Sequence, residues 1–99
     1  MIEGLKLQVA SDQLLTHLLE RERHHRDRAA FYDGKRAEME AAGERPANVT
    51  NDPVKAMADR ALHHTQRADA FAVQAKYLIP GETYRLDNHD LSRLEMASL

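Results

Sequence analysis

The sequence predicts a mainly α-helical fold: a long antiparallel helical hairpin with a short two-stranded terminal β ribbon and a short C-terminal helix. Three observations predict it. Two long segments contain no proline beyond the first position, a polar loop of residues 44–52 separates them, and short stretches of alternating apolar residues flank them. Long helices joined by a short loop pack antiparallel. The flanking segments then meet at the open end of the hairpin.

The first half of the chain predicts one strand and one long helix. Residues 2–9 alternate apolar and polar side chains, which is typical of a strand. Ser11 is suited to cap a helix that runs from Asp12 to Ala42. Gly43 then provides the left-handed backbone conformation that ends many helices.

The second half begins with a clear start signal for a helix. Asp52 is a good capping residue, and Pro53 is favoured at the first helical position. We expect this helix to continue to Ile79, where Pro80 and Gly81 interrupt it.

The C-terminal part predicts a second strand and a last helix. Residues 82–86 alternate as the first strand does. Asp87 or Asn88 then caps a short helix over residues 88–96.

Length and composition limit the function. The 99 residues form one domain, 1–99, with formal net charge −2 and no cysteine, so a thiolate metal site and a disulfide framework are excluded. The charge balance argues against nucleic-acid binding, and short apolar runs argue against a membrane span. We find no signal-peptide pattern and expect a cytoplasmic protein. Because two helices alone bury little, we also expect a homo-oligomer, with a dimer as the first hypothesis.

Each long helix carries a stripe of residues at three and four spacing, and both stripes are apolar at the ends and contain histidine in the middle. The first stripe is Leu15, Leu18, Glu22, His25, Ala29, Tyr32, Arg36 and Met39; the second is Val54, Met57, Ala61, His64, Ala68, Phe71, Ala75 and Leu78. We expect His17 and His89, which lie outside both stripes, to be exposed.

Both helices contain the pattern His-His-x-x-Arg-Ala with a phenylalanine shortly after it, at an offset of 39 residues. Arginine offers planar donors that match phosphate oxygens, histidine adds a donor, and an aromatic ring can stack on a base. These residue types between two helices predict a pocket for a small anionic, nucleotide-like ligand. The candidate ligand-binding residues are Arg21, His25, Arg28, Tyr32, Arg60, His64, Arg67 and Phe71. Whether the two copies form one pocket or two stays open.

Other interpretations stay open. The arginines are also suited to a solvated charged face, paired with acidic neighbours on their own helices. Glu22 and His25 have the Glu-x-x-His spacing of carboxylate metal bundles, so a metal-binding helical bundle is an alternative. A helical protein–protein adaptor is another. No phosphate loop or nucleophile motif is present, so we expect no enzymatic activity, no cofactor and no catalytic residue.

Several short segments resemble small uncharacterised helical-hairpin proteins of phage and prophage genomes. They are residues 1–4, 51–54, 81–84 and 90–95. The resemblance implies no known activity, so no functional residue carries over from it. It does imply a setting, because phages encode small oligomeric proteins that sequester nucleotide signals of bacterial immunity. An Arg/His pocket between helices suits that counter-defence task.

Overall fold

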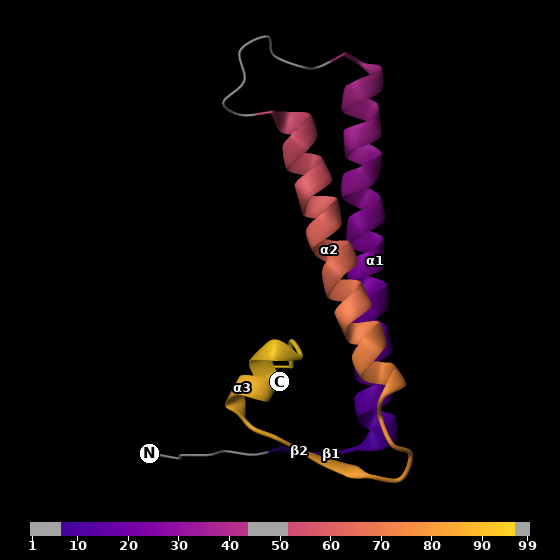
Figure 1. The fold of residues 1–99 in the computed structure, drawn as a ribbon, viewed down its shortest axis with the longest axis vertical. Coiled ribbons are helices and arrows are strands. Elements are labelled where there is room, and N and C mark those ends of the chain that lie inside the picture. The colour runs from indigo at the N-terminus through magenta and orange to yellow at the C-terminus, as the bar shows by residue number, and fades with distance from the viewer. Residues whose placement is uncertain (1–6, 44–51, 97–99) are drawn as a thin grey trace. The chain divides into compact units, whose positions relative to one another are not determined.

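The computed structural model describes residues 7–43 and 52–96 (Figure 1). Its elements are β1 (Leu7–Ala10), α1 (Ser11–Ala41), α2 (Pro53–Lys76), β2 (Thr83–Leu86) and α3 (Asn88–Arg93). The predicted fold class is confirmed: two long helices pack antiparallel, accompanied by one antiparallel strand pair and a short C-terminal helix. The loop predicted at residues 44–52 lies outside the described residues, except for its last one.

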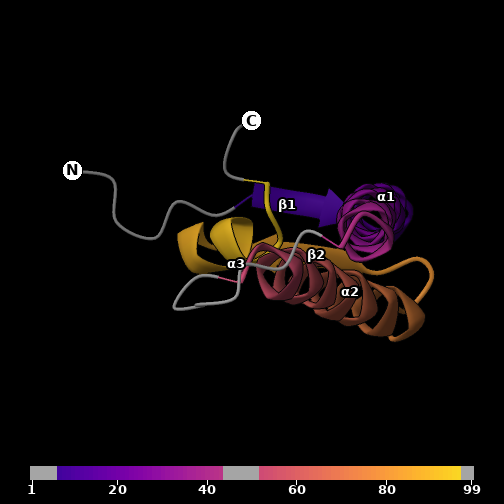
Figure 2. The same cartoon turned by 90° about the horizontal axis from the view of Figure 1, so that it is seen from above.

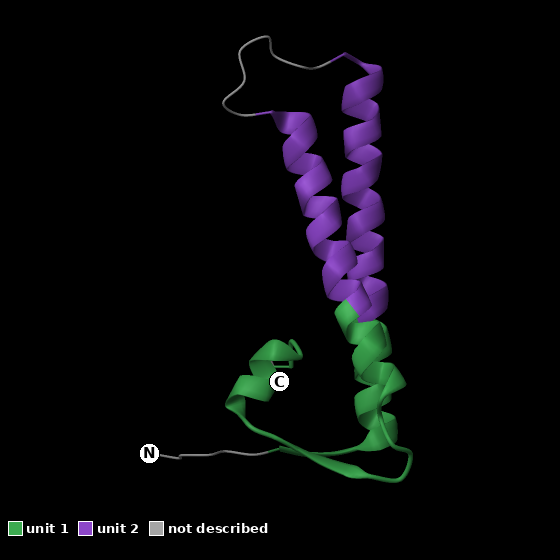
Figure 3. Cartoon of the chain, viewed as in Figure 1, with its two compact units in different colours: residues 1–21, 70–99 green, residues 22–69 purple. Residues whose placement is uncertain are grey.

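The chain divides into two compact units (Figure 3). Unit 1 contains residues 1–21 and 70–99, and unit 2 contains Glu22–Asp69. In each unit, a part of α1 runs beside a part of α2. The prediction of a single domain over 1–99 stays a prediction.

Unit 1 holds the hydrophobic core. Its β1 and β2 pair antiparallel, with Leu7 opposite Leu86 and Ala10 opposite Thr83, and α3 lies beside this ribbon (Figure 2). The core consists of buried apolar residues from β1, α1, α2, β2 and the segment that follows α3: Val9, Leu14, Leu18, Phe71, Leu86, Leu94 and Met96. Each Å² of apolar surface that is buried stabilises the folded state by about 25 cal/mol. This cluster is therefore the main source of stability in unit 1.

Helix ends follow the predicted signals at two places. Asp52 accepts hydrogen bonds from the backbone N–H groups of Val54 and Lys55 through one carboxylate oxygen, at 2.9 and 3.3 Å. This is the capping contact that the Asp-Pro pair predicts. After α1, Gly43 has a φ of 68°, which confirms its left-handed conformation.

Two predicted helices are longer than the observed ones. The second ends at Lys76 rather than Ile79 because Pro80 disfavours helical residues before it. The N–H groups of Tyr77 and Leu78 instead bond to carbonyls three residues back.

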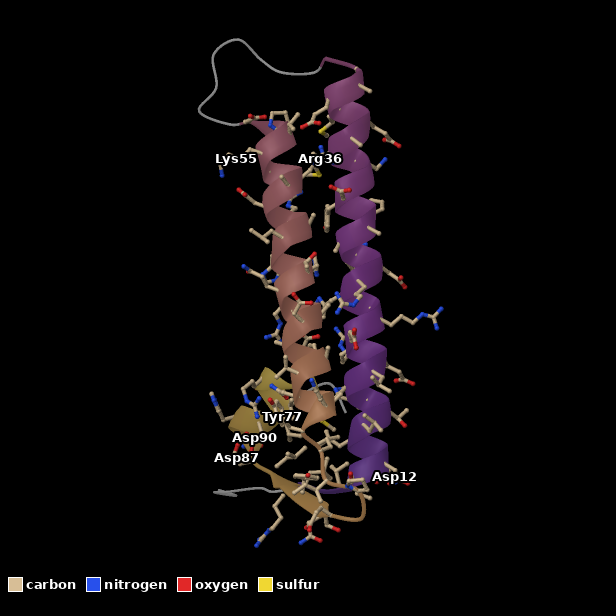
Figure 4. All side chains as sticks on the ribbon, turned by 45° about the vertical axis from the view of Figure 1, so that its right-hand side comes forward. Asp12, Arg36, Lys55, Tyr77, Asp87 and Asp90 are labelled. Atoms are coloured by element: carbon tan, nitrogen blue, oxygen red, sulfur yellow. The ribbon has the colours of Figure 1, made fainter. Side chains whose placement is uncertain are left out.

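The last helix ends at Arg93 rather than Met96. Glu95 adopts φ 59°, and the Met96 N–H reaches the Leu91 carbonyl at 2.7 Å, which closes a left-handed C-terminal cap. Its start is fixed by Asp87 and Asp90, adjacent in Figure 4, each of which accepts from the other's backbone N–H.

Two smaller predictions at the N-terminal end change. The strand predicted over residues 2–9 is observed as Leu7–Ala10, and residues 2–6 lie outside the described part. Ser11 is the first residue of α1 rather than its cap, and its N–H donates to the Glu82 carbonyl at 2.9 Å.

The predicted apolar stripe of α1 is wrong at its first residue. Leu15 is 37% exposed, whereas Leu14 is 4% exposed and lies in the core. Both residues fit helical periodicity, and only the position of the core distinguishes them.

Of the two histidines expected to be exposed, His89 is confirmed and His17 is not. The half-buried His17 places its Nε2 atom 2.7 Å from the Leu94 carbonyl oxygen. That acceptor comes from the far end of the chain, so no local pattern could reveal it.

Candidate functional site

The structure separates the eight predicted ligand-binding residues into two groups. Two of them, Arg21 and Phe71, belong to unit 1. Arg21 donates from Nε to a Glu95 carboxylate oxygen at 2.8 Å, and Phe71 is only 2% exposed within the hydrophobic core. Both therefore have structural partners within unit 1. The other six residues lie in unit 2: His25, Arg28, Tyr32, Arg60, His64 and Arg67.

The repeated sequence pattern brings one histidine of each copy together. The Nδ1 atoms of His25 and His64 lie 2.8 Å apart, and their rings stack with centroids 5.0 Å apart. We call these two residues the histidine pair. One Nδ1 atom must carry a proton and donate it, and the other must be bare and accept it. The two copies therefore meet at one place in unit 2.

Two further histidines flank the pair. His24 and His63 each contact their neighbour edge-on, with ring centroids 5.2 and 5.1 Å apart. Both flanking rings are exposed, whereas His25 is 5% exposed. We call His25 and His64 the inner rings, which form the contact between the two helices. His24 and His63 are the outer rings, which lie at the surface of this contact.

The environment of His64 opposes positive charge on its ring. Burial lowers the pKa of His64 below its ordinary value, and the charges of His25, His63, Arg28 and His24 lower it further. Both effects favour the uncharged form of this side chain.

A second cluster continues from the pair along unit 2. The Tyr32 ring stacks almost parallel on His64, with centroids 5.6 Å apart and an 8° angle between planes. Its hydroxyl accepts a hydrogen bond from Arg28 at 2.8 Å. The guanidinium carbons of Arg28 and Arg60 lie 5.0 and 5.7 Å from the centre of the Tyr32 ring. We call Arg28, Tyr32, Arg60 and His64 the Tyr32 cluster.

The two arginines of this cluster differ from their neighbours. Arg26 binds Glu22 and Asp69 at 2.9 and 3.2 Å, and Arg36 binds two further carboxylates. Within residues 7–43 and 52–96, neither Arg28 nor Arg60 forms an ion pair; their contacts are aromatic rings and the Tyr32 hydroxyl. Two cations from different helices thus share one ring, and no carboxylate of the described residues neutralises them.

Sequence reasoning missed Phe31. Its ring is 49% exposed and lies 5.1 Å from the Arg28 guanidinium carbon. The spacing of three residues between Arg28 and Phe31 is the signal that indicates this contact on one helix. It places an exposed aromatic ring beside the Tyr32 cluster.

The described residues show no metal site that would support the alternative of a metal-binding helical bundle. In the part of the chain that the structure describes, no group of three or more histidine, aspartate or glutamate side chains is arranged to hold a metal ion. Glu22, its proposed carboxylate ligand, accepts a hydrogen bond from Arg26. A metal shared with a second copy of the chain stays an untested hypothesis.

Comparison with protein-family models, with curated proteins and with solved structures finds no match for this chain. The likeness to phage proteins therefore stays an expectation from the sequence. Across the described residues, none of the helices has an apolar stretch of the length that crossing a membrane requires.

Proposed function

We propose that the chain is a non-enzymatic homo-oligomer that binds a small anionic, nucleotide-like ligand at the Tyr32 cluster of unit 2. Arg28 and Arg60 would hold the negative group, and His64 would lie beside them. One observation carries the proposal: both guanidinium groups lie over the same ring without an acidic partner among the described residues.

Electrostatics favours an anion at this position. Two guanidinium groups near one ring repel each other, and a shared anion replaces that repulsion with attraction. Each group also has donors left after its ring contacts, and Arg donors match the oxygens of phosphate in pairs. Arg28 is half-buried, which weakens solvent screening of its charge.

The ligand class follows from what surrounds the two cations. The Phe31 ring is half exposed and lies beside Arg28, so it offers a face for a planar base. Tyr32 is already stacked on His64 and bonded by Arg28, so we assign it to positioning the arginines rather than to stacking a base. Arg21 and Phe71 are not used in this proposal, because both belong to unit 1.

Homo-oligomer formation is supported by apolar exposure. Unit 2 exposes Leu62 by 55%, and unit 1 exposes Val73, Tyr77 and Ile79 by 53%, 75% and 59%. Such side chains are usual at contacts between copies. Light scattering that finds only monomer at every concentration would remove the oligomer from the proposal.

A thermal-shift panel tests the ligand. It includes sulfate, pyrophosphate, cyclic and linear adenine nucleotides, ADP-ribose and divalent metals. An anion at about 100 times its Kd stabilises the folded state by about 2.7 kcal/mol, which raises Tm by several degrees. We expect a rise with nucleotide anions. A panel without any anion-dependent rise would overturn the proposal and favour the protein adaptor, and a rise with metals alone would favour the metal bundle.

Variants then locate the ligand. We expect Arg28→Gln and Arg60→Gln each to weaken binding at least about tenfold, since each removes one charge-assisted contact. Arg23→Gln is the matched control, because Arg23 is exposed on α1 and forms no ion pair among the described residues. Equal weakening by all three changes would indicate a general charge effect instead of a site.

The wider role, sequestering a nucleotide signal in phage counter-defence, rests on the sequence resemblance and stays a prediction. Sequestration requires that the protein releases the bound ligand chemically unchanged. Chromatography of the released ligand can test this.

A further inference from the structure

We propose that anion binding at the Tyr32 cluster is coupled to the uptake of one proton by the histidine pair, so that binding strengthens as the solution becomes more acidic. This inference rests on the proposed function and adds its regulation. It is carried by the hydrogen bond between His25 and His64 and by the stack that joins this bond to the arginines.

The hydrogen bond fixes how many protons the pair can take. In the uncharged pair, one ring carries its proton on Nδ1 and donates it to the bare Nδ1 of the other ring. The donor ring then has a bare Nε2 atom. One added proton on this atom makes the donor an imidazolium and strengthens the bond. A second added proton would occupy the accepting Nδ1 and break the contact, so the pair accepts one proton while it stays intact.

The charges around the pair keep this proton off when no anion is bound. From α1, the facing groups are His24 and Arg28, together with the hydroxyl of Tyr32. From α2, the facing group is His63, and Arg60 and Arg67 lie one turn before and after His64 on the same helix. These groups are cationic or become cationic on protonation, apart from the neutral tyrosine. The nearby carboxylates of Glu22 and Asp69 are engaged by Arg26.

The Tyr32 cluster connects the anion to the pair. His64 is at once a member of the histidine pair and the ring stacked on Tyr32 at 5.6 Å, and Arg28 bonds the hydroxyl of the same tyrosine. An anion on Arg28 and Arg60 offsets the positive field of Arg28 at His64. Protonation then costs less, so the bound state takes up a proton that the free state does not hold.

Linkage sets the direction and the limit of the effect. Because the bound state holds more protons than the free state, affinity rises as pH falls through the pKa of the pair in the complex. A single proton limits the change to about tenfold in Kd per pH unit. Affinity stops changing once the free pair is protonated too.

The test uses sulfate, whose charge is constant between about pH 5 and 8, so any titration in that range belongs to the protein. Calorimetry in two buffers of different ionisation enthalpy measures the protons taken up, with sodium chloride holding ionic strength constant. We expect sulfate to bind more tightly at about pH 6 than at about pH 8, with uptake of up to one proton.

Variants assign the proton to the pair. Replacing both inner rings, His25→Gln with His64→Gln, should remove both the pH dependence and the proton uptake of the sulfate binding that remains. The matched control replaces both outer rings, His24→Gln with His63→Gln, and should keep proton uptake. Loss of uptake in the outer-ring variant alone would overturn the inference.

A measurement without variants covers the case in which the inner-ring change unfolds unit 2. Nitrogen NMR of the intact protein should show one protonated and one bare Nδ1 atom in the pair at neutral pH, and sulfate should shift the pair toward its protonated form. Sulfate binding without proton uptake overturns this inference and leaves the proposed function standing. No binding of sulfate or any panel nucleotide, at any pH, overturns both.

Discussion

At the scale of single residues, the contact between His25 and His64 is the feature on which most of the site depends. The sequence pattern singled out both histidines, and the 39-residue offset between the copies is the separation at which they meet. What the pattern could not show is which side chains of each copy face inward. His24 and His63 belong to the same two copies of the pattern, yet both are exposed. Only the packing of α1 on α2 separates inner rings from outer rings.

His64 makes the stability of the protein depend on pH. The pKa of His64 is lowered in the folded state by burial and by the charges around it, so the unfolded chain binds a proton more readily. Its contribution to stability is therefore full above the unfolded value of about 6.5 and is lost as pH falls toward the folded pKa. We expect Tm to fall between about pH 7 and 5, and His64→Gln to reduce that fall. His89→Gln, at an exposed position, is the control, and equal pH profiles for all three proteins would contradict the expectation.

At the scale of elements, local signals placed the helix starts better than the helix ends. Asp52 and Pro53 are sufficient to start α2, because capping depends only on adjacent residues. The end of α3 depends instead on Glu95, a residue type that rarely adopts the left-handed conformation. Glu95 also binds Arg21, 74 residues earlier in the chain. A contact at that separation has no local signature, so the early stop could not be predicted.

Helix α1 contains a glycine that its structure does not require. Gly34 lies inside the helix, and a Cβ atom added there would meet nothing within 4 Å. We expect Gly34→Ala to stabilise the protein by about 0.5–1 kcal/mol in urea unfolding, because alanine loses less backbone entropy. Gly81→Ala is the opposite control, since its φ of 85° strains any other residue. A loss of stability on Gly34→Ala would show that the glycine is needed.

At the scale of the whole molecule, the two compact units contain different features. Unit 1 holds the apolar core, whereas unit 2 holds the histidine pair and the Tyr32 cluster. Helical periodicity gave Phe71 and Tyr32 equivalent positions on their stripes, so the sequence alone could not separate a core ring from a site ring. The division of the chain into units makes that distinction.

The two phenylalanines test this division directly. Phe71 is 2% exposed in the unit 1 core, and Phe31 is 49% exposed in unit 2. We expect Phe71→Ala to destabilise unit 1 by about 3–5 kcal/mol, through lost burial and the cavity it leaves. Phe31→Ala should cost less than about 1 kcal/mol. Hydrogen exchange measures both, and similar losses from the two changes would contradict the assignment.

Mapping a bound anion by NMR tests the central claim most directly. Adenosine diphosphate is added at neutral pH while the side-chain signals of arginine, tyrosine and histidine are followed. The account predicts that the largest shifts fall on Arg28, Tyr32, Arg60 and His64, and that Arg21 in unit 1 changes little. Shifts centred on unit 1, or no shift in unit 2 at saturating nucleotide, would contradict it.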